Sequence, residues 1–223
     1  MTSVLRTEFH CHTIFSKDSL TKPVDLVQAA RRKGLDRVVV TDHNSIEGAR
    51  AAQAIAPDLI ILGEEIKTSR GEILASFMTE EIPAGLSPQE TIHRLRDQGA
   101  FISVSHPYDV LRSGHWHEAE LLEITPLVDA IETFNARCMR AEFNVQAQEF
   151  ARKYTLAGTV GSDAHAAFEL GRAHLVLPFF DSAEGLRSVI GQAQAVTRLS
   201  SPWVHLTSRW ASLMKETGLA SAK

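Results

Sequence analysis

The chain has 223 residues, 44% of them hydrophobic and 22% charged, which suits one globular domain and is short for two. Its formal net charge of −4 excludes the basic excess with which proteins grip long nucleic acids through phosphate contacts alone. The two cysteines are too few for a disulfide framework, no apolar run could span a bilayer, and the first residues lack the core of a signal peptide, so we expect a cytoplasmic protein.

Short apolar runs alternate with helix-like segments along the chain, the pattern of repeated βα units around a largely parallel sheet. The expected strands are residues 4–10, 37–41, 59–62, 72–77, 101–104, 128–132, 155–160 and 174–177. The expected helices are residues 23–33, 46–55, 88–98, 140–153 and 183–192, with Ser87 as a cap and Pro88 in the first turn of the third. We therefore expect one α/β domain over residues 1–223, with residues 200–223 as a peripheral C-terminal tail that contains a helix.

The first expected strand runs into the sequence Phe9-His10-Cys11-His12-Thr13. Side chains alternate along a strand, so His10 and His12 point the same way while Cys11 points oppositely. Two imidazoles on one face can present two nitrogen ligands to one cation, and Asp18 in the following loop can add an oxygen. This motif alone is weak, because the chain has ten histidines.

Other expected strands also end in an imidazole or a carboxylate. These residues are His43, Glu65, His106, Asp163 and His165. In a barrel of parallel strands the carboxyl ends meet at one mouth, so we expect all of them in a single site. Nitrogen and oxygen ligands without thiolate suit zinc, manganese or iron(II), and there are too many for one ion. The sequence therefore predicts a cluster of two or three divalent metal ions.

Five stretches resemble the PHP (polymerase and histidinol phosphatase) domain family, in family order and over nearly the whole chain. They are Phe9–Thr13 with Ser16–Asp18, Thr41–Asn44, Gly63–Ile66, Ser105–Pro107 and Gly161–His165. The resemblance implies a distorted (β/α)7 barrel whose metal site lies at the C-terminal ends of the strands. It also implies three ligand sets, which are His10, His12, Glu65 and Asp163 for one ion, Glu65 and His106 for a second, and Asp18, His43 and His165 for a third.

The chain departs from this family in two places. Many members carry a further histidine on the strand after the glutamate, where this chain has Leu74. Glu72 lies two residues earlier on the same strand face, and it either replaces that imidazole or is a solvated surface side chain. Some phosphoesterases of the family insert a cap domain between the metal strands. There is no room for one between Glu72 and His106, so we expect an open mouth.

Further polar residues lie near these strand ends. Glu132 is a candidate proton shuttle or supporting partner of a ligand, and Arg137 could hold a phosphate or form a surface salt bridge. The segment 108–117, which contains His115 and His117, is expected to be a loop that faces solvent or the substrate. Three histidines are expected to be structural and away from the mouth: His93, His174 and His205.

The leading functional hypothesis is a metal-dependent phosphoesterase, an enzyme in which metal-activated hydroxide hydrolyses a phosphate ester. The family resemblance points to a small phosphomonoester, such as histidinol phosphate or a nucleotide, or to the end of a short oligonucleotide. We expect no membrane contact, and no obligate protein partner is evident. The alternatives are a non-catalytic, regulatory metal-binding module and an amidohydrolase-like enzyme that acts on a non-phosphate bond.

Overall fold

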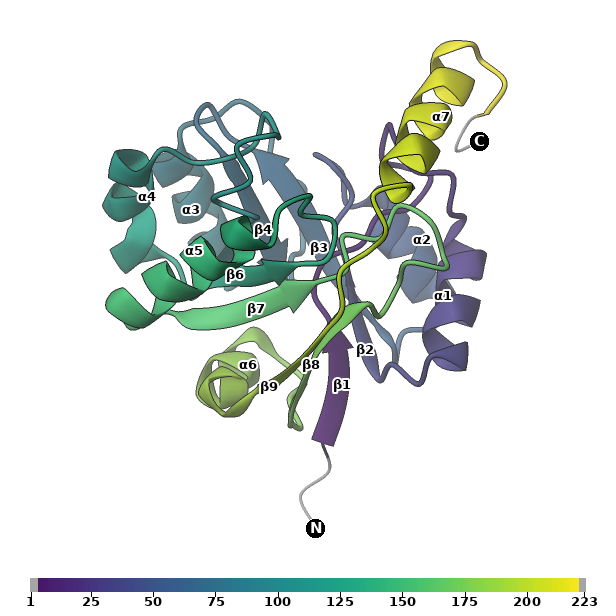
Figure 1. The fold of residues 1–223 in the computed structure, drawn as a ribbon. Helices are drawn as coiled ribbons and strands as arrows, with labels where there is room; N and C mark the ends of the chain where they lie inside the picture. Colours follow the sequence, from purple (N-terminus) through teal and green to yellow (C-terminus); the bar gives the residue numbers. More distant parts are fainter. Residues whose placement is uncertain (1–3, 221–223) are drawn as a thin grey trace.

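The computed structural model describes residues 4–220, which form nine strands and seven α-helices (Figure 1). The strands are β1 (Val4–Glu8), β2 (Arg37–Val40), β3 (Ile60–Lys67), β4 (Glu72–Ser76), β5 (Phe101–Val104), β6 (Ala130–Asn135), β7 (Ala157–Gly161), β8 (Ala173–Pro178) and β9 (Gln194–Thr197). The helices are α1 (Pro23–Arg32), α2 (Glu47–Ile55), α3 (Pro88–Asp97), α4 (Glu118–Ile124), α5 (Ala141–Lys153), α6 (Ala183–Val189) and α7 (Val204–Glu216). Within this part of the chain, no helix has both the length and the hydrophobicity that a membrane span requires.

Local sequence signals set several of these boundaries. Pro88 opens α3 as expected, and the Ser87 hydroxyl caps the helix by accepting the Glu90 N–H at 3.2 Å. The expected first strand is too long, because β1 ends at Glu8 and leaves His10 and His12 in the segment that follows it. Sequence reasoning also missed α4 and β9, whose few residues carry only a weak periodic signal.

The strands form one mixed sheet in the order β7-β6-β5-β4-β3-β2-β1-β8-β9. The neighbours β1, β2 and β3 are parallel, as are β5, β6 and β7. However, β4 is antiparallel to both β3 and β5, and β8 is antiparallel to β1 and β9. The reason for the first reversal is length, since residues 68–71 between β3 and β4 form a turn and a parallel crossover needs a dozen residues or more.

The sheet curls into a nearly closed barrel because the segments after β1 and β7 meet at one end. The Asp163 N–H donates to the His10 carbonyl, and the His12 N–H donates to the Ala164 carbonyl, both at 2.8 Å. Cys11 and Ala164 form an isolated parallel bridge at the same place. The α/β barrel class expected from the sequence is therefore confirmed, and we call the end of the barrel at which these segments meet the mouth.

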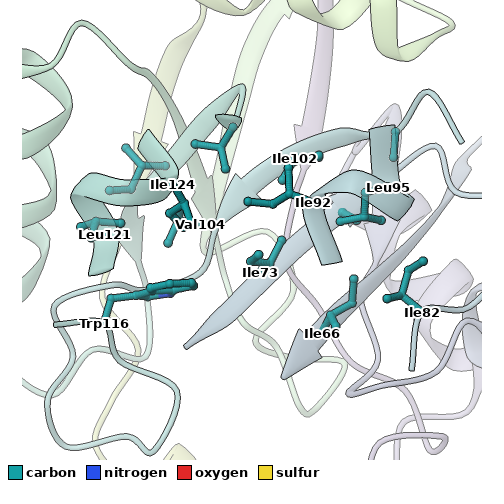
Figure 2. Close-up of a cluster of buried hydrophobic side chains, with 14 of the residues drawn as sticks. Ile66, Ile73, Ile82, Ile92, Leu95, Ile102, Val104, Trp116, Leu121 and Ile124 are labelled. Atoms are coloured by element: carbon teal, nitrogen blue, oxygen red, sulfur yellow. The ribbon is translucent and has the colours of Figure 1, made fainter. Parts of the chain in front are cut away.

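Apolar packing of the helices against the outer faces of the strands holds the barrel together. Figure 2 shows one such layer, in which Ile66, Ile73 and Ile102 of β3, β4 and β5 pack with Ile92 and Leu95 of α3. The same layer includes Trp116, Leu121 and Ile124. Complete burial of these side chains fixes the strands that carry the polar groups of the mouth.

Candidate metal centre

Five imidazole rings gather at the mouth of the barrel. The ring of His12 lies at the centre, with centroids 4.2 Å from His165, 4.4 Å from His43 and 5.1 Å from His10. The ring of His106 stacks on His10 at 5.8 Å. Three carboxylates lie among these rings, and the structure thus brings together residues from both ends of the chain: Asp18, Glu65 and Asp163.

The first group of donors consists of His10 Nε2, His12 Nε2 and Asp163 Oδ1. Their mutual separations are 3.1, 3.1 and 3.6 Å. The edge of a tetrahedron whose corners lie about 2.0–2.1 Å from a central zinc is about 3.3–3.4 Å, so these atoms are spaced like three ligands of one ion. The two Nε2 atoms lie 3.1 Å apart, and nitrogen atoms that converge in this way can bind one shared cation.

Glu65 connects the first group to the second. Its Oε2 lies 3.2 Å from His10 Nε2 and 3.1 Å from His43 Nδ1, while its Oε1 lies 3.1 Å from His106 Nε2. The Ser105 hydroxyl donates to Oε1 at 2.6 Å and fixes this orientation. One carboxylate therefore presents an oxygen to each of two donor groups, which is what a bridging ligand between two ions must do.

Glu72 belongs to the second group and is not a solvated surface side chain. Its Oε2 lies 3.6 Å from His106 Nε2, and Glu65, Glu72 and His106 form a set of donors close enough to hold one ion. Because β4 is antiparallel, Glu72 reaches the mouth from the start of its strand rather than from the end. The loop backbone at Gly114 packs directly on its carboxylate, since a Cβ there would lie 1.7 Å from Glu72 Oε2.

The third group consists of Asp18, His43 and His165, and it is more open to solvent. His12 is also close enough to His43 and His165 to share an ion with them. His165 Nε2 lies 3.2 Å from Asp18 Oδ2, and His43 Nε2 lies 3.7 Å from Asp18 Oδ1. The side chains of His43 and Asp18 are each 21% exposed. The buried Oδ1 of Asp18 has no hydrogen-bond partner, so it remains available to a cation.

Buried polar groups outside these sets orient the donors. Glu132 Oε1 accepts from His10 Nδ1 at 3.0 Å, and its Oε2 accepts the His106 N–H at 2.8 Å. The Ser16 hydroxyl lies 3.1 Å from His12 Nδ1, and the Asp163 carbonyl lies 2.9 Å from His165 Nδ1. Metal-binding histidines usually donate their second ring nitrogen in this way, which directs the other nitrogen at the ion.

The electrostatics of the mouth are those of a site that needs cations. Burial lowers the pKa of His10, but the carboxylates of Glu65, Asp163 and Glu132 raise it by more than burial lowers it. The pKa of His10 therefore lies well above its usual value. Burial and the neighbouring His165 and His43 hold the pKa of His12 well below its usual value. The carboxylates around His10 and the imidazoles around His12 thus shift the pKa values of these two rings in opposite directions. The donor set fits divalent metal ions.

Sequence reasoning missed Arg112, which lies in the loop between β5 and α4. Its Nη1 pairs with Asp163 and its Nε donates to Asp109 Oδ2 at 3.0 Å. Burial lowers the pKa of this guanidinium, but the two carboxylates raise it above its usual range. The only sequence signal was its position in segment 108–117, because a contact between residues this far apart leaves no local pattern. That loop is anchored rather than free, since Trp116 is buried and its indole N–H donates to the Glu72 carbonyl at 3.0 Å.

Arg137 is a buried residue and not part of a surface salt bridge. Its Nε lies 3.3 Å from Glu169 Oε2, and its Nη2 donates to the Val204 carbonyl at 2.7 Å and the Ser208 hydroxyl at 2.8 Å. These contacts place α7 over the mouth. The expectation that His205 lies away from the mouth is therefore wrong, because α7 brings it to the cavity. His93 is exposed on α3, and His174 of β8 lies beside Arg6 of β1; neither residue lines the cavity.

A cavity of about 600 Å³ lies above the third donor group. Asp18, His43, Glu72, His106 and His165 form its floor. Cationic side chains also line it: Lys17, Lys67, Arg112, Arg137 and Lys215. Loop 13–16 contributes Ile14 and Phe15, and α7 contributes His205 and Ser208. The cavity could admit a small organic anion whose charged group faces the donors.

Comparisons with known proteins show which sequences this chain resembles. The family model described as "PHP-associated" matches residues 141–194. An uncharacterised protein of Methanocaldococcus jannaschii, MJ0417, is 37% identical over 174 residues, which are 77% of this chain and 70% of that protein.

Solved structures share the fold at low sequence identity. One is a two-domain protein from Bacteroides vulgatus, described as containing a predicted PHP-like metal-dependent phosphoesterase. It has a TM-score of 0.73 and 19% identity, and the match covers 94% of this chain and 70% of that one. PsfC from Pseudomonas syringae has a TM-score of 0.69 and 16% identity, covering 98% of this chain and 100% of that one.

Proposed function

Because the chain belongs to the PHP family, we propose that it is a metal-dependent hydrolase that cleaves a small phosphate ester. The observation that carries the proposal is the gathering of three donor groups at the mouth, where members of the second and third groups line the cavity and Glu65 faces the first and second. The Bacteroides vulgatus protein, which shares the fold, is described as containing a predicted PHP-like metal-dependent phosphoesterase. Two or three divalent ions, of zinc, manganese or iron, would be held by the donors named above.

Bound at these donors, divalent ions would lower the pKa of a coordinated water and neutralise charge on a phosphate. The chain's own residues set the geometry for this chemistry. Glu132 and Ser16 hold the rings of His10 and His12 through their second nitrogens, so their Nε2 atoms stay directed at the shared position. Burial of these donors keeps bulk water away from them.

Arg112 is the best candidate for binding the phosphate of the substrate. Its guanidinium has five N–H donors, and its contacts with Asp163, Asp109 and Asn135 leave others free to face the cavity. A planar guanidinium suits phosphate oxygens because it can donate two parallel hydrogen bonds. Lys67 lies on the same wall, with its Nζ 2.9 Å from the Ser113 hydroxyl and 42% of its side chain exposed, and can attract an anion to the mouth.

The size and the walls of the cavity favour a small phosphomonoester, of the histidinol phosphate or nucleotide kind, or the terminal nucleotide of a short oligonucleotide. A volume of about 600 Å³ suits one small metabolite. Phe15 and Ile14 supply the apolar contact that the organic part of such a substrate needs.

The test is hydrolysis of p-nitrophenyl phosphate and of a panel of phosphorylated metabolites, with and without added Mn²⁺ or Zn²⁺. We expect metal-dependent release of phosphate by the wild type and none by Asp163→Ala or His10→Ala variants that retain the wild-type circular dichroism. Unchanged turnover in either variant would contradict the proposed site. If the wild type binds metal but releases no phosphate from any substrate, the two alternatives that remain are a non-catalytic metal-binding module and an enzyme that acts on a non-phosphate bond.

A further inference from the structure

Helix α7 lies over the mouth, yet it buries little apolar surface of its own. Among its residues only Val204 and Ala211 are buried. Leu206, Trp210 and Leu213 remain 52%, 59% and 50% exposed. Figure 1 shows α7 extending from one end of the barrel, away from the helices that cover the sheet. Polar contacts therefore contribute much of what seats this helix, and such an element can open without unfolding the domain.

The first anchor ties the start of α7 to the segment that carries His165. Arg137 Nη2 donates to the Val204 carbonyl and the Ser208 hydroxyl, while its Nε faces the fully buried Glu169. The other oxygen of Glu169 accepts the N–H of His165 at 3.3 Å and of Ala166 at 3.1 Å. An ion pair between Arg137 and Glu169 thus joins the hydrogen bonds of α7 to those on the backbone of a metal-donor residue.

The second anchor ties the end of α7 to the segment that carries Asp18. Lys215 Nζ donates to the carbonyls of Ile14 and Ser16. The hydroxyl of Ser16 contacts His12 Nδ1 and also accepts the N–H of His43 at 3.0 Å. Asp18 follows two residues later. Both anchors of α7 therefore fall on segments that supply the third donor group.

We propose that the seating of α7 and the binding of a divalent ion by Asp18, His43 and His165 are coupled, so that ion binding closes this wall of the cavity. The inference rests on the proposed function for the existence of the ion site. A bound ion fixes the side chains of Asp18 and His165, and α7 fixes the segments that carry them. Ion binding therefore lowers the entropy cost of seating α7, and a seated α7 lowers the entropy cost of binding the ion. By linkage the coupling is reciprocal, and couplings of this kind change affinities by about 5- to 150-fold.

The decisive variant is Lys215→Met in the full chain, with Arg209→Met as its control. Both remove one positive charge from α7, but Arg209 is exposed and Lys215 holds the second anchor. Loss of a positive charge near the carboxylates would by itself strengthen binding of a cation. We expect the opposite for Lys215→Met, a fall of about tenfold in Mn²⁺ affinity by calorimetry on chelator-treated protein. The Mn²⁺ affinity of Arg209→Met should stay within about twofold of the wild type, because a solvent-exposed charge contributes little.

Two further measurements test whether the loss of Mn²⁺ affinity in Lys215→Met arises at the third donor group and whether Mn²⁺ binding orders α7. In an Asp18→Asn background, Lys215→Met should no longer change Mn²⁺ affinity. Saturating Mn²⁺ should slow protease cleavage within residues 198–220 of the wild type at least fivefold, and this protection should be lost in Lys215→Met. Ser208→Ala, which weakens the first anchor, should reduce the protection in the same direction.

The outcomes separate this inference from the proposed function. A wild type that binds neither Mn²⁺, Zn²⁺ nor Fe²⁺ defeats both. A wild type that binds Mn²⁺ while Lys215→Met binds it equally or more tightly, or while protease cleavage ignores the metal, overturns the coupling and leaves the proposed hydrolase standing.

Discussion

Replacement of Glu132 by glutamine tests whether the groups behind the donors set metal affinity. Both oxygens of this buried carboxylate accept hydrogen bonds, Oε1 from His10 Nδ1 at 3.0 Å and Oε2 from the His106 N–H at 2.8 Å. A glutamine amide can accept at one end only, and its NH2 group then faces a donor at the other end. Either orientation therefore disturbs His10 or His106, although the size of the side chain hardly changes.

The expected loss of metal affinity follows from the role of groups that hydrogen-bond to metal-binding residues. Loss of one typically lowers metal affinity by about 10- to 100-fold, or about 1.4–2.7 kcal/mol. The assay is calorimetric titration of chelator-treated protein with Mn²⁺ or Zn²⁺, with circular dichroism to confirm that the variant is folded. Glu184→Gln is the matched control, because the side chain of Glu184 is 89% exposed and away from the mouth. If folded Glu132→Gln binds metal as tightly as this control, Glu132 does not orient the donors and our reasoning about the site is refuted.

Two predictions concern the stability of the fold. Burial and the nearby Glu81 raise the pKa of Glu64 to about 8 from 4.5. Between these two pH values the folded protein holds a proton on Glu64 that the unfolded chain releases. The contribution of protonated Glu64 to the free energy of unfolding is therefore present at low pH and is lost between about pH 4.5 and 8. Relative to wild type, Glu64→Gln should thus gain up to about 5 kcal/mol on going from pH 4 to pH 9 in urea titrations, and a constant difference would contradict the raised pKa. Trp116→Ala should lower the free energy of unfolding by about 3–5 kcal/mol. The control is Trp203→Ala, at a residue 75% exposed, which should change the free energy of unfolding by less than about 0.5 kcal/mol. Equal losses in the two variants would show that burial of Trp116 does not stabilise the fold.

The roles of Glu72 and of α7 show where reading the sequence alone falls short. The departure at Leu74 left Glu72 as either a ligand or a surface residue, and the direction of β4 places its carboxylate at the mouth beside His106. That direction follows from the short turn at residues 68–71, so a stricter reading of loop length could have predicted it. The place of α7 over the mouth could not be read in this way, because it depends on the contacts of Arg137 and Lys215 with distant backbone carbonyls.

The sequence by itself determined the alternation of strands and helices, the types of donor at the ends of the segments, and the family. These features are local, because a strand, a cap or a His-x-His motif is recorded within a few consecutive residues. Tertiary structure alone decided that Arg112 pairs with Asp163 and that His205 lines the cavity. Each of these depends on where the closing barrel places side chains that lie tens of residues apart, and no short stretch of sequence specifies that placement.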